Sequence, residues 1–236
     1  MDIGFHYIDA PKVNAKKQAF TMLELVMVIV VLGILAALAL PRMERDGRQQ
    51  AADNILSAIR YTQHLALLDD KTDPLNVQWQ RRFWHIRFSS YTKDGQTLWF
   101  YTVSSSRDGD NNVDQDEAAT DPSNGRLMFN ANGDSAIDPN ESPNIFIGEQ
   151  YGITTVDFSA CNVVTGASGV APGNPQHIAF DHLGRPHRGI YNAGNNFATI
   201  TQQNCVIRFG SPDFEDFSIT IENQTGHAFI NGQLES

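Results

Sequence analysis

Residues 20–40 decide the fold: they read FTMLELVMVIVVLGILAALAL, and Glu24 is their only charged side chain. A helix rises about 1.5 Å per residue, so this stretch would be about 31 Å long, close to the thickness of a bilayer's hydrocarbon core. We therefore predict a transmembrane helix over residues 20–40. Pro41 ends the apolar run, and its missing amide N–H predicts a local break in the helix there.

The polar residues before this helix allow two simple interpretations. A basic segment, an apolar run and the small-x-small sequence at 37–39 fit a secretory signal peptide, although the run is longer than such peptides have. A plain, uncleaved membrane anchor is the other interpretation. Flanking charge does not orient it, because Lys12, Lys16 and Lys17 precede the run while three arginines follow within residues 42–48.

Glu24 is the unusual residue of the run, since a carboxylate inside a spanning segment usually has a partner. Thr21 and Glu24 fit the pattern S/T-x-x-E, so Glu24 could simply cap the start of the helix. Alternatively, Glu24 could pair with a cation that reaches it only after assembly. The sequence leaves both roles open.

Residues 16–41, KKQAFTMLELVMVIVVLGILAALALP, resemble the leader and hydrophobic helix of type IV prepilins and type II secretion pseudopilins. The resemblance implies that residues 1–19 are a leader removed by a prepilin peptidase between Ala19 and Phe20. It implies methylation of the new amine of Phe20, and pairing of that amine with Glu24 of a neighbouring subunit. Ala19 stands where the family usually has glycine, and both residues are small.

Residues 41–70 are expected to continue the helix in amphipathic form. Apolar side chains recur at helical spacing in QQAADNILSAIRYTQHLALL (49–68), at Ala52, Ile55, Leu56, Ile59, Ala66 and Leu67, while Arg60 and Gln63 are expected to face outward. Such a stripe is typical of a helix laid against a sheet.

Residues 71–236 show short β patterns separated by turn residues and no alternation with helices, so we predict an α+β fold in which one long helix packs on an antiparallel β head in a pilin-like way. The expected strands are 83–89, 97–103, 126–129, 144–147, 153–158, 177–181, 197–201, 205–209, 217–221 and 227–230. IAFDHLGRP (178–186), CVIRF (205–209) and FSITIENQTGHAFI (217–230) are similar to the head of H-type minor pseudopilins. Cys161 and Cys205 suit a disulfide outside the cytoplasm, and two separate buried thiols are the alternative.

Two acidic stretches align without gaps, SRDGDNNVDQDE (106–117) and NANGDSAIDPNE (130–141). Each fits a twelve-residue calcium loop, although flanking helices and the usual first aspartate are missing. The predicted ligands are Asp108, Asp110, Asn112 through its carbonyl, Asp114 and Glu117 in the first loop, and Asn130, Asn132, Asp134, Asp138 and Glu141 in the second. Two calcium sites, one shared site or a metal-free acidic insert over 106–141 would all fit.

Charge and motifs argue against other classes of function. The net charge is −10 and the mean hydropathy is −0.31, which disfavours nucleic acid as a partner and excludes a polytopic membrane protein. No hydrolase, metalloprotease or P-loop motif occurs, so no enzyme is predicted. His177, His182 and His187 are expected at turns and on the surface rather than on zinc. Arg185, His187 and Arg188 form a small basic spot, which is the most suitable DNA-binding surface if the head binds DNA.

Together these features predict a pseudopilin of a type II secretion pseudopilus. It would be a single-pass protein of the bacterial inner membrane with its head in the periplasm, and its partners would be other pseudopilins or pilins and the prepilin peptidase. Two alternatives stay open: a minor type IV pilin for DNA uptake or adhesion, and a calcium-dependent binding module on an uncleaved anchor.

Overall fold

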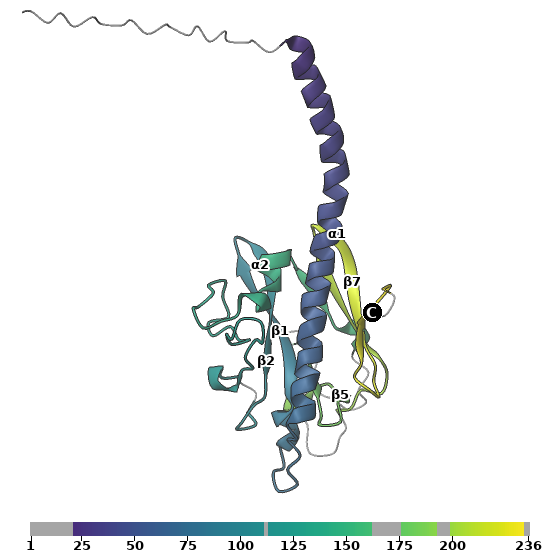
Figure 1. The fold of residues 1–236 in the computed structure, drawn as a ribbon. Helices are drawn as coiled ribbons and strands as arrows, with labels where there is room; N and C mark the ends of the chain where they lie inside the picture. The colour runs from purple at the N-terminus through teal and green to yellow at the C-terminus, as the bar shows by residue number, and fades with distance from the viewer. Residues whose placement is uncertain (1–20, 111–112, 162–175, 193–198, 234–236) are drawn as a thin grey trace, which may run out of the picture. The chain divides into compact units, whose positions relative to one another are not determined.

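The structure, a computed structural model, describes residues 21–110, 113–161, 176–192 and 199–233, and for residues 36–46 it describes the backbone alone. The chain divides into two compact units, residues 1–42 and 43–236. Figure 1 shows the order of the elements along the chain.

Helix α1 (Met22–Leu68) is the first element, and it belongs to both units. It is continuous through Pro41, so the break expected there was wrong. A proline removes one intrahelical hydrogen bond and strains the preceding turn, and in α1 the flanking residues keep helical geometry. Among the residues with described structure, no helix is both long and apolar enough to cross a membrane.

The part of α1 in the second unit is amphipathic, as its apolar spacing predicts. Its buried face consists of Ala51, Ala52, Ile55, Leu56, Ala58, Ile59 and Ala66, each at most 8% exposed. Leu67 is 51% exposed, so its place in the stripe was wrong. Ala66 of the same turn is 1% exposed, so the final turn is still covered on one face and position 67 lies outside that face.

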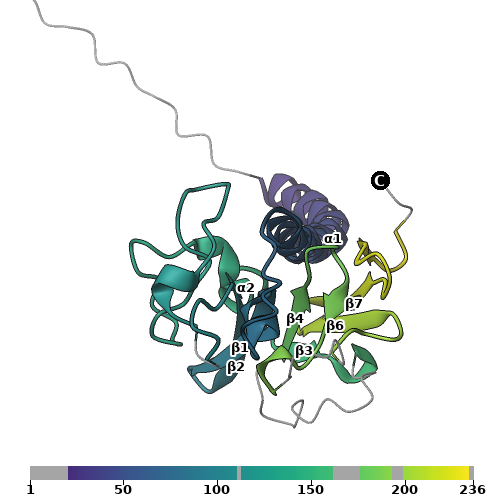
Figure 2. The ribbon, with the colours of Figure 1, turned by 90° about the horizontal axis from the view of Figure 1, so that it is seen from below.

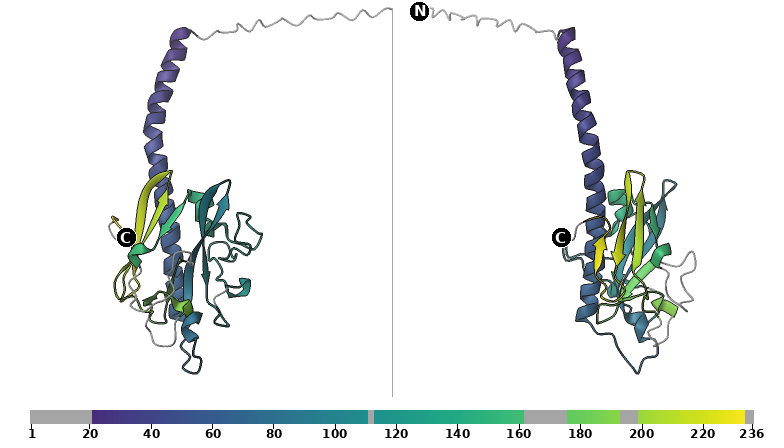
Figure 3. Two further views of the ribbon diagram at one scale, coloured as in Figure 1. Left: turned by 180° about the vertical axis from the view of Figure 1, so that it is seen from behind. Right: turned by 90° about the vertical axis from the view of Figure 1, so that its right-hand side faces the viewer.

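Two four-stranded antiparallel sheets form the head. The first has the order β2-β1-β4-β5, with β1 (Trp84–Lys93), β2 (Gln96–Ser104), β4 (Gln176–Phe180) and β5 (Pro186–His187). The second has the order β3-β6-β7-β8, with β3 (Thr155–Asp157), β6 (Cys205–Ser211), β7 (Phe214–Ile221) and β8 (Ala228–Ile230). Figure 2 shows both sheets beside α1, and Figure 3 gives two side views. The fold is α+β with antiparallel sheets and an N-terminal helix.

Helical turns replace one of the expected strands, and two others form no strand in the described residues: 126–129, and 197–201, of which 197–198 lie outside the described residues and Ile200 makes only an isolated bridge to His187. NIFI (144–147) falls in a 3-10 turn, Pro143–Ile145, and the short helix α2 (Ile147–Tyr151). Ser142 caps this turn by accepting a hydrogen bond from the Asn144 N–H, and Pro143 occupies its first position. RLMF (126–129) makes only isolated bridges, through Leu127. The remaining short turns are Trp79–Arg82, Gln115–Glu117, Ser159–Cys161 and Ile190–Asn192.

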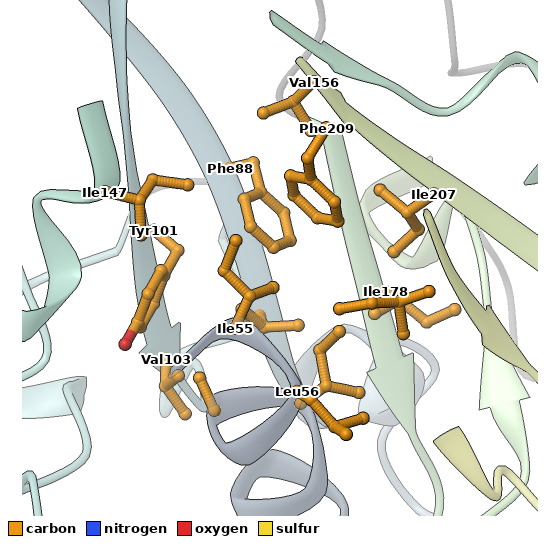
Figure 4. Close-up of a cluster of buried hydrophobic side chains, with 14 of the residues drawn as sticks. Ile55, Leu56, Phe88, Tyr101, Val103, Ile147, Val156, Ile178, Ile207 and Phe209 are labelled. Atoms are coloured by element: carbon orange, nitrogen blue, oxygen red, sulfur yellow. The ribbon is translucent and has the colours of Figure 1, made fainter. Parts of the chain in front are cut away.

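One hydrophobic core joins α1 to both sheets (Figure 4). Ile55 of α1, Phe88 of β1, Ile178 of β4 and Phe209 of β6 are each at most 1% exposed. The rings of Phe88 and Phe209 lie 5.6 Å apart and connect the two sheets. Burying side chains of this size contributes about 1.5–3 kcal/mol each, so this core holds the helix and the sheets together.

Polar contacts fix the register of α1 against the end of the chain. The Arg60 guanidinium donates twice to the Ala228 carbonyl, at 3.1 and 2.9 Å. Gln63 Nε2 donates to the carbonyls of Gly184 and Thr225, at 2.9 and 2.8 Å. Both side chains were expected to face outward. Each also donates hydrogen bonds to backbone carbonyls that lie close to α1.

A disulfide joins Cys161 to Cys205, the first residue of β6. Both cysteines are 1% exposed. The bond ties the segment after β3 to the second sheet.

Candidate functional site

The first turn of α1 holds Glu24 in a capping box. Its Oε2 accepts hydrogen bonds from the backbone N–H and the hydroxyl of Thr21, both at 3.0 Å, and the Glu24 N–H donates to Thr21 Oγ1 at 3.3 Å. This geometry realises one of the two roles that the sequence left open for Glu24. Ala19 and Phe20 lie outside the described residues.

Apolar side chains surround α1 on all sides in the residues that follow. All fourteen residues from Met22 to Leu35 are exposed, and the large hydrophobic ones among them are 50–86% exposed. They include Met22, Leu23, Leu25, Val26, Met27, Val28, Ile29, Val30, Val31, Leu32, Ile34 and Leu35. A surface this apolar marks a segment that binds another apolar surface.

The two acidic loops share one hydrogen-bonding scheme. The twelfth residue, Glu117 or Glu141, is at most 7% exposed, and its carboxylate accepts from the N–H groups of the second and ninth residues. In the second loop these distances are 2.7 Å from Ala131 N and 3.1 Å from Asp138 N. The first residue accepts from the N–H of the fourth, a glycine with φ of +78° or +64°. The sequence repeat is therefore also a structural repeat.

The aspartates of the loops lie mostly on the outside. Asp108, Asp110, Asn132, Asp134 and Asp138 are exposed or half-buried, while Asn130 is buried and Asn112 lies outside the described residues. In the first loop, burial and the charges of Glu117, Asp110, Asp116 and Asp108 raise the pKa of Asp114 above its usual value. Arg107 relieves part of this repulsion through its ion pair with Asp116, at 2.9 Å.

The loops do not form a ready-made metal centre. Within the part of the chain that the structure describes, no three His, Cys, Asp or Glu side chains are grouped so as to hold a metal ion. Each twelfth-position glutamate, the usual bidentate ligand of such a loop, is already bound to two backbone N–H groups. Calcium binding therefore stays a prediction, and it would require these carboxylates to turn.

Histidine and arginine side chains of the first sheet are buried, which corrects two expectations. His177 and His187 are 3% and 0% exposed, so they are not surface residues. Arg188 is 0% exposed, and its guanidinium lies 4.6 Å from the centre of the Phe158 ring and donates to the His177 carbonyl. Two residues of the basic spot expected for DNA, His187 and Arg188, are thus buried, and the third, Arg185, is partly exposed and paired with Asp181.

Asp181 is the counter-ion within this region. Its Oδ2 accepts from Arg185 at 2.7 and 2.8 Å and lies 3.4 Å from His187 Nε2. Burial would raise the pKa of Asp181, but hydrogen bonds from His187 and Arg185 outweigh it and hold this pKa at about 2. Burial lowers the pKa of His187 in spite of Asp181. These contacts fix the turn after β4.

His85 is a buried histidine that the sequence analysis missed. It is 0% exposed, its Nδ1 lies 3.0 Å from the Phe83 carbonyl, and Ser104 Oγ lies 3.2 Å from its Nε2. A carbonyl only accepts, so Nδ1 carries the proton and Nε2 accepts from the Ser104 hydroxyl. The sequence carries no signal for it, because both His85 and the next residue, Ile86, are buried: β1 lies inside its sheet and is covered on both faces there.

Residues 14–40 match the prokaryotic N-terminal methylation motif. This motif is the prepilin-like leader of type IV pilins and pseudopilins, and the match confirms the resemblance seen in the sequence. The motif supports a precursor of the type IV pilin-like or pseudopilin kind, and it points to a structural protein. Comparison with curated proteins and with solved structures gave no match.

Proposed function

We propose that the protein is a pseudopilin, a subunit of a type II secretion pseudopilus that a prepilin peptidase cleaves between Ala19 and Phe20. The methylation motif at residues 14–40 carries this proposal. The mature subunit is held in the inner membrane by residues 20–40, with its head in the periplasm, until it joins other pseudopilins. The disulfide of the head suits that oxidising compartment.

The start of α1 supports assembly with similar helices. Between Met22 and Leu35 the helix exposes apolar side chains around its whole circumference. In a filament core this surface would pack against the same segment of neighbouring subunits, and burial would contribute about 25 cal/mol for each Å² removed from water. Such an apolar surface is suited to the lipid bilayer before assembly and to the filament core after assembly.

Mass spectrometry of the N-terminus of the native protein tests the proposal. We expect a mature chain that begins at Phe20 and carries one methyl group on its amine. An intact chain beginning at Met1 in the assembled, working protein would contradict processing and favour the uncleaved anchor.

Glu24 is proposed to neutralise the Phe20 amine of a neighbouring subunit. Its Oε2 is bound to Thr21, whereas its Oε1 accepts no hydrogen bond from the described residues. Leaving a buried charge without its partner costs about 3–5 kcal/mol, so loss of the carboxylate would strongly impair incorporation. The capping box gives Glu24 a second role in the monomer, and the two roles need separate variants.

Two substitutions separate pairing from capping. Glu24→Gln keeps a capping side chain but removes the charge, whereas Thr21→Val removes the cap, worth about 1 kcal/mol, and keeps the charge. We expect both variants to be cleaved normally, and only Glu24→Gln to lose co-assembly with partner pilins, measured by cross-linking. Loss of assembly in Thr21→Val but not in Glu24→Gln would show that only the cap matters.

A minor type IV pilin remains the alternative, since its leader is the same. The basic spot that the sequence suggested for DNA is unfavourable for it, because His187 and Arg188 are buried and Arg185 is paired with Asp181. Co-purification with secretion components or with pilus components separates the two systems.

We also propose that the first acidic loop binds one calcium ion. Loss of solvent contact and the charges of neighbouring carboxylates both raise the pKa of Asp114, and a divalent cation would relieve the repulsion among these carboxylates. We expect a chelator to lower the melting temperature of the full chain and calcium to restore it. In chelator, Asp114→Asn should have a higher melting temperature than the native chain, and calcium should not change that temperature. The control variant Asp94→Asn, in the β1–β2 turn, should respond to calcium as the native chain does. A chelator without effect on the native chain would remove this proposal.

A further inference from the structure

A cavity of about 320 Å³ lies between α1 and the segment that follows the first acidic loop. Asp53, Asn54, Ser57, Ala58 and Tyr61 of α1 form one wall. Tyr101 of β2 and Met128 form its base, and residues 121–123 with Asn144 form the other wall. Ligand pockets range from about 300 to 1,000 Å³, so this one has room for a single side chain rather than a cofactor.

The cavity carries negative charge and no positive charge. Two carboxylates line it, Asp53 and Asp121, and none of the described residues that line it is basic. Its remaining walls are the aromatic faces of Tyr61 and Tyr101 and the apolar side chains of Ala58 and Met128. Apolar walls with a few carboxylates suit a cation carried on an aliphatic stem, which can also lie against aromatic faces.

Asp121 is the buried charge of the cavity, at 4% exposed. Neutral donors hold it: Ser123 N and Oγ at 2.8 and 2.7 Å, Asn124 Nδ2 at 3.1 Å and Asn144 Nδ2 at 2.9 Å, with the Ser142 hydroxyl. These hydrogen bonds outweigh burial and lower its pKa, so it stays ionised, and no ion pair reaches it from the described residues. Its charge adds to burial in raising the pKa of both Tyr61 and Tyr101, so its field extends across the cavity.

The surroundings of the cavity repel anions and attract basic surfaces. The insert at residues 106–141 has nine acidic side chains and two arginines, a net charge of −7. Such a field speeds the approach of a positively charged protein surface and has much less effect on a molecule with a single charge.

We infer that this cavity is a docking site for an arginine side chain that projects from a basic surface of a partner protein. The stem would lie between Ala58, Met128 and the two tyrosine rings, and the charged head would approach Asp53 and Asp121. This inference goes beyond the proposed function, because it depends on neither N-terminal cleavage nor calcium.

Three probes test the inference against the full chain in detergent micelles, by NMR titration of the backbone amides of residues 53–61, Asp121 and Ser123. They are a blocked Lys-Gly-Arg-Gly-Lys peptide, the same peptide with citrulline in place of arginine, and free ethylguanidinium. We expect saturable shifts with the arginine peptide, weakened by salt, and an affinity about tenfold lower for the citrulline peptide, because the charge-assisted hydrogen bond is lost. We expect ethylguanidinium to bind more weakly than the arginine peptide.

Variants of the chain localise the binding. Asp53→Asn on the exposed face of α1 should weaken the arginine peptide about tenfold, and Ser57→Trp should block the cavity. Asp121→Asn should also weaken binding of the arginine peptide. Because Asp121→Asn loosens the loop that contains it as well, the decisive variant is Asp53→Asn, at an exposed position. Asp94→Asn, which makes the same change of charge in the β1–β2 turn, should bind normally.

Other outcomes would overturn the inference. Equal affinity for the arginine and citrulline peptides would mean that the cavity does not recognise the positive charge of the arginine side chain. Unchanged affinity in Asp53→Asn and Ser57→Trp would place binding elsewhere. Ethylguanidinium binding as tightly as the peptide would make the occupant a small cation rather than a partner protein.

Discussion

Acidification tests the buried state of His85 in the head. Burial, opposed by the hydrogen bond to the Phe83 carbonyl and aided by the nearby charge of Arg87, lowers the pKa of His85 to about 4 from the usual 6.5. The rings of His177 and Tyr191 face it at 6.4 and 5.4 Å between centroids. In the folded protein His85 is therefore neutral at pH values at which the unfolded chain is already protonated.

The direction and size of the change in stability follow from the linkage between proton binding and folding. Between pH 6.5 and 4 the unfolded chain binds the proton and the folded chain does not, so stability is complete above pH 6.5 and falls as the pH drops toward 4. Each pH unit is worth at most about 1.4 kcal/mol per histidine, and the whole interval is worth about 3 kcal/mol for His85. His187, whose pKa is also lowered by burial, adds a loss in the same direction.

The assay compares the native chain with His85→Gln, which keeps a polar side chain of similar reach but does not titrate. Urea unfolding at pH 7, 6, 5 and 4 is followed by tryptophan fluorescence, which reports on the head because all three tryptophans, Trp79, Trp84 and Trp99, lie there. Between pH 7 and 4 the native chain should lose about 3 kcal/mol more than His85→Gln. His227→Gln, at an exposed position, should follow the native chain. Equal losses in the native chain and His85→Gln would refute the reasoning.

Two further predictions concern stability. Replacing Cys161 and Cys205 together by alanine opens a loop of 44 residues and should lower the free energy of unfolding by about 4 kcal/mol, measured by urea titration; a loss below 1 kcal/mol would count against it. Gly226→Ala should cost about 3 kcal/mol, because φ there is +68° and the new Cβ would collide with the Gly184 carbonyl, whereas Gly232→Ala, with φ of +82° and open space around it, should cost about 1 kcal/mol. Equal melting temperatures for the two glycine variants would contradict the collision.

The sequence predicted those elements whose side-chain pattern is decided locally. The spacing of Ile55, Leu56 and Ile59 defined the buried face of α1, and the alternation in residues 217–221 lies inside β7. The gapless alignment of 106–117 with 130–141 predicted two loops of one kind, and Glu117 and Glu141 do occupy the same position in both. In each case one short stretch carries the whole signal.

Other features depend on contacts between distant segments. His177 and His187 were expected at turns and on the surface, yet His177 lies in β4, between β1 and β5, and His187 lies in β5, and both are buried. NIFI at 144–147 was apolar enough for a strand, but Ser142 and Pro143 before it are the usual start of a helical turn. The cavity beside Asp121 joins residues 53–61 to residues 121–144, and no local pattern announces such an approach.

The hydrogen bonds from Arg60 and Gln63 to the Ala228, Gly184 and Thr225 carbonyls have a mechanical consequence. They tie the long helix to strand β8, to the turn before it, which contains Thr225, and to the turn between β4 and β5, which contains Gly184. Tension applied along the helix would load these bonds in shear, all at once, rather than peel them apart one by one. A subunit pulled by its N-terminal end would therefore keep its head folded up to a higher force than the core alone would sustain.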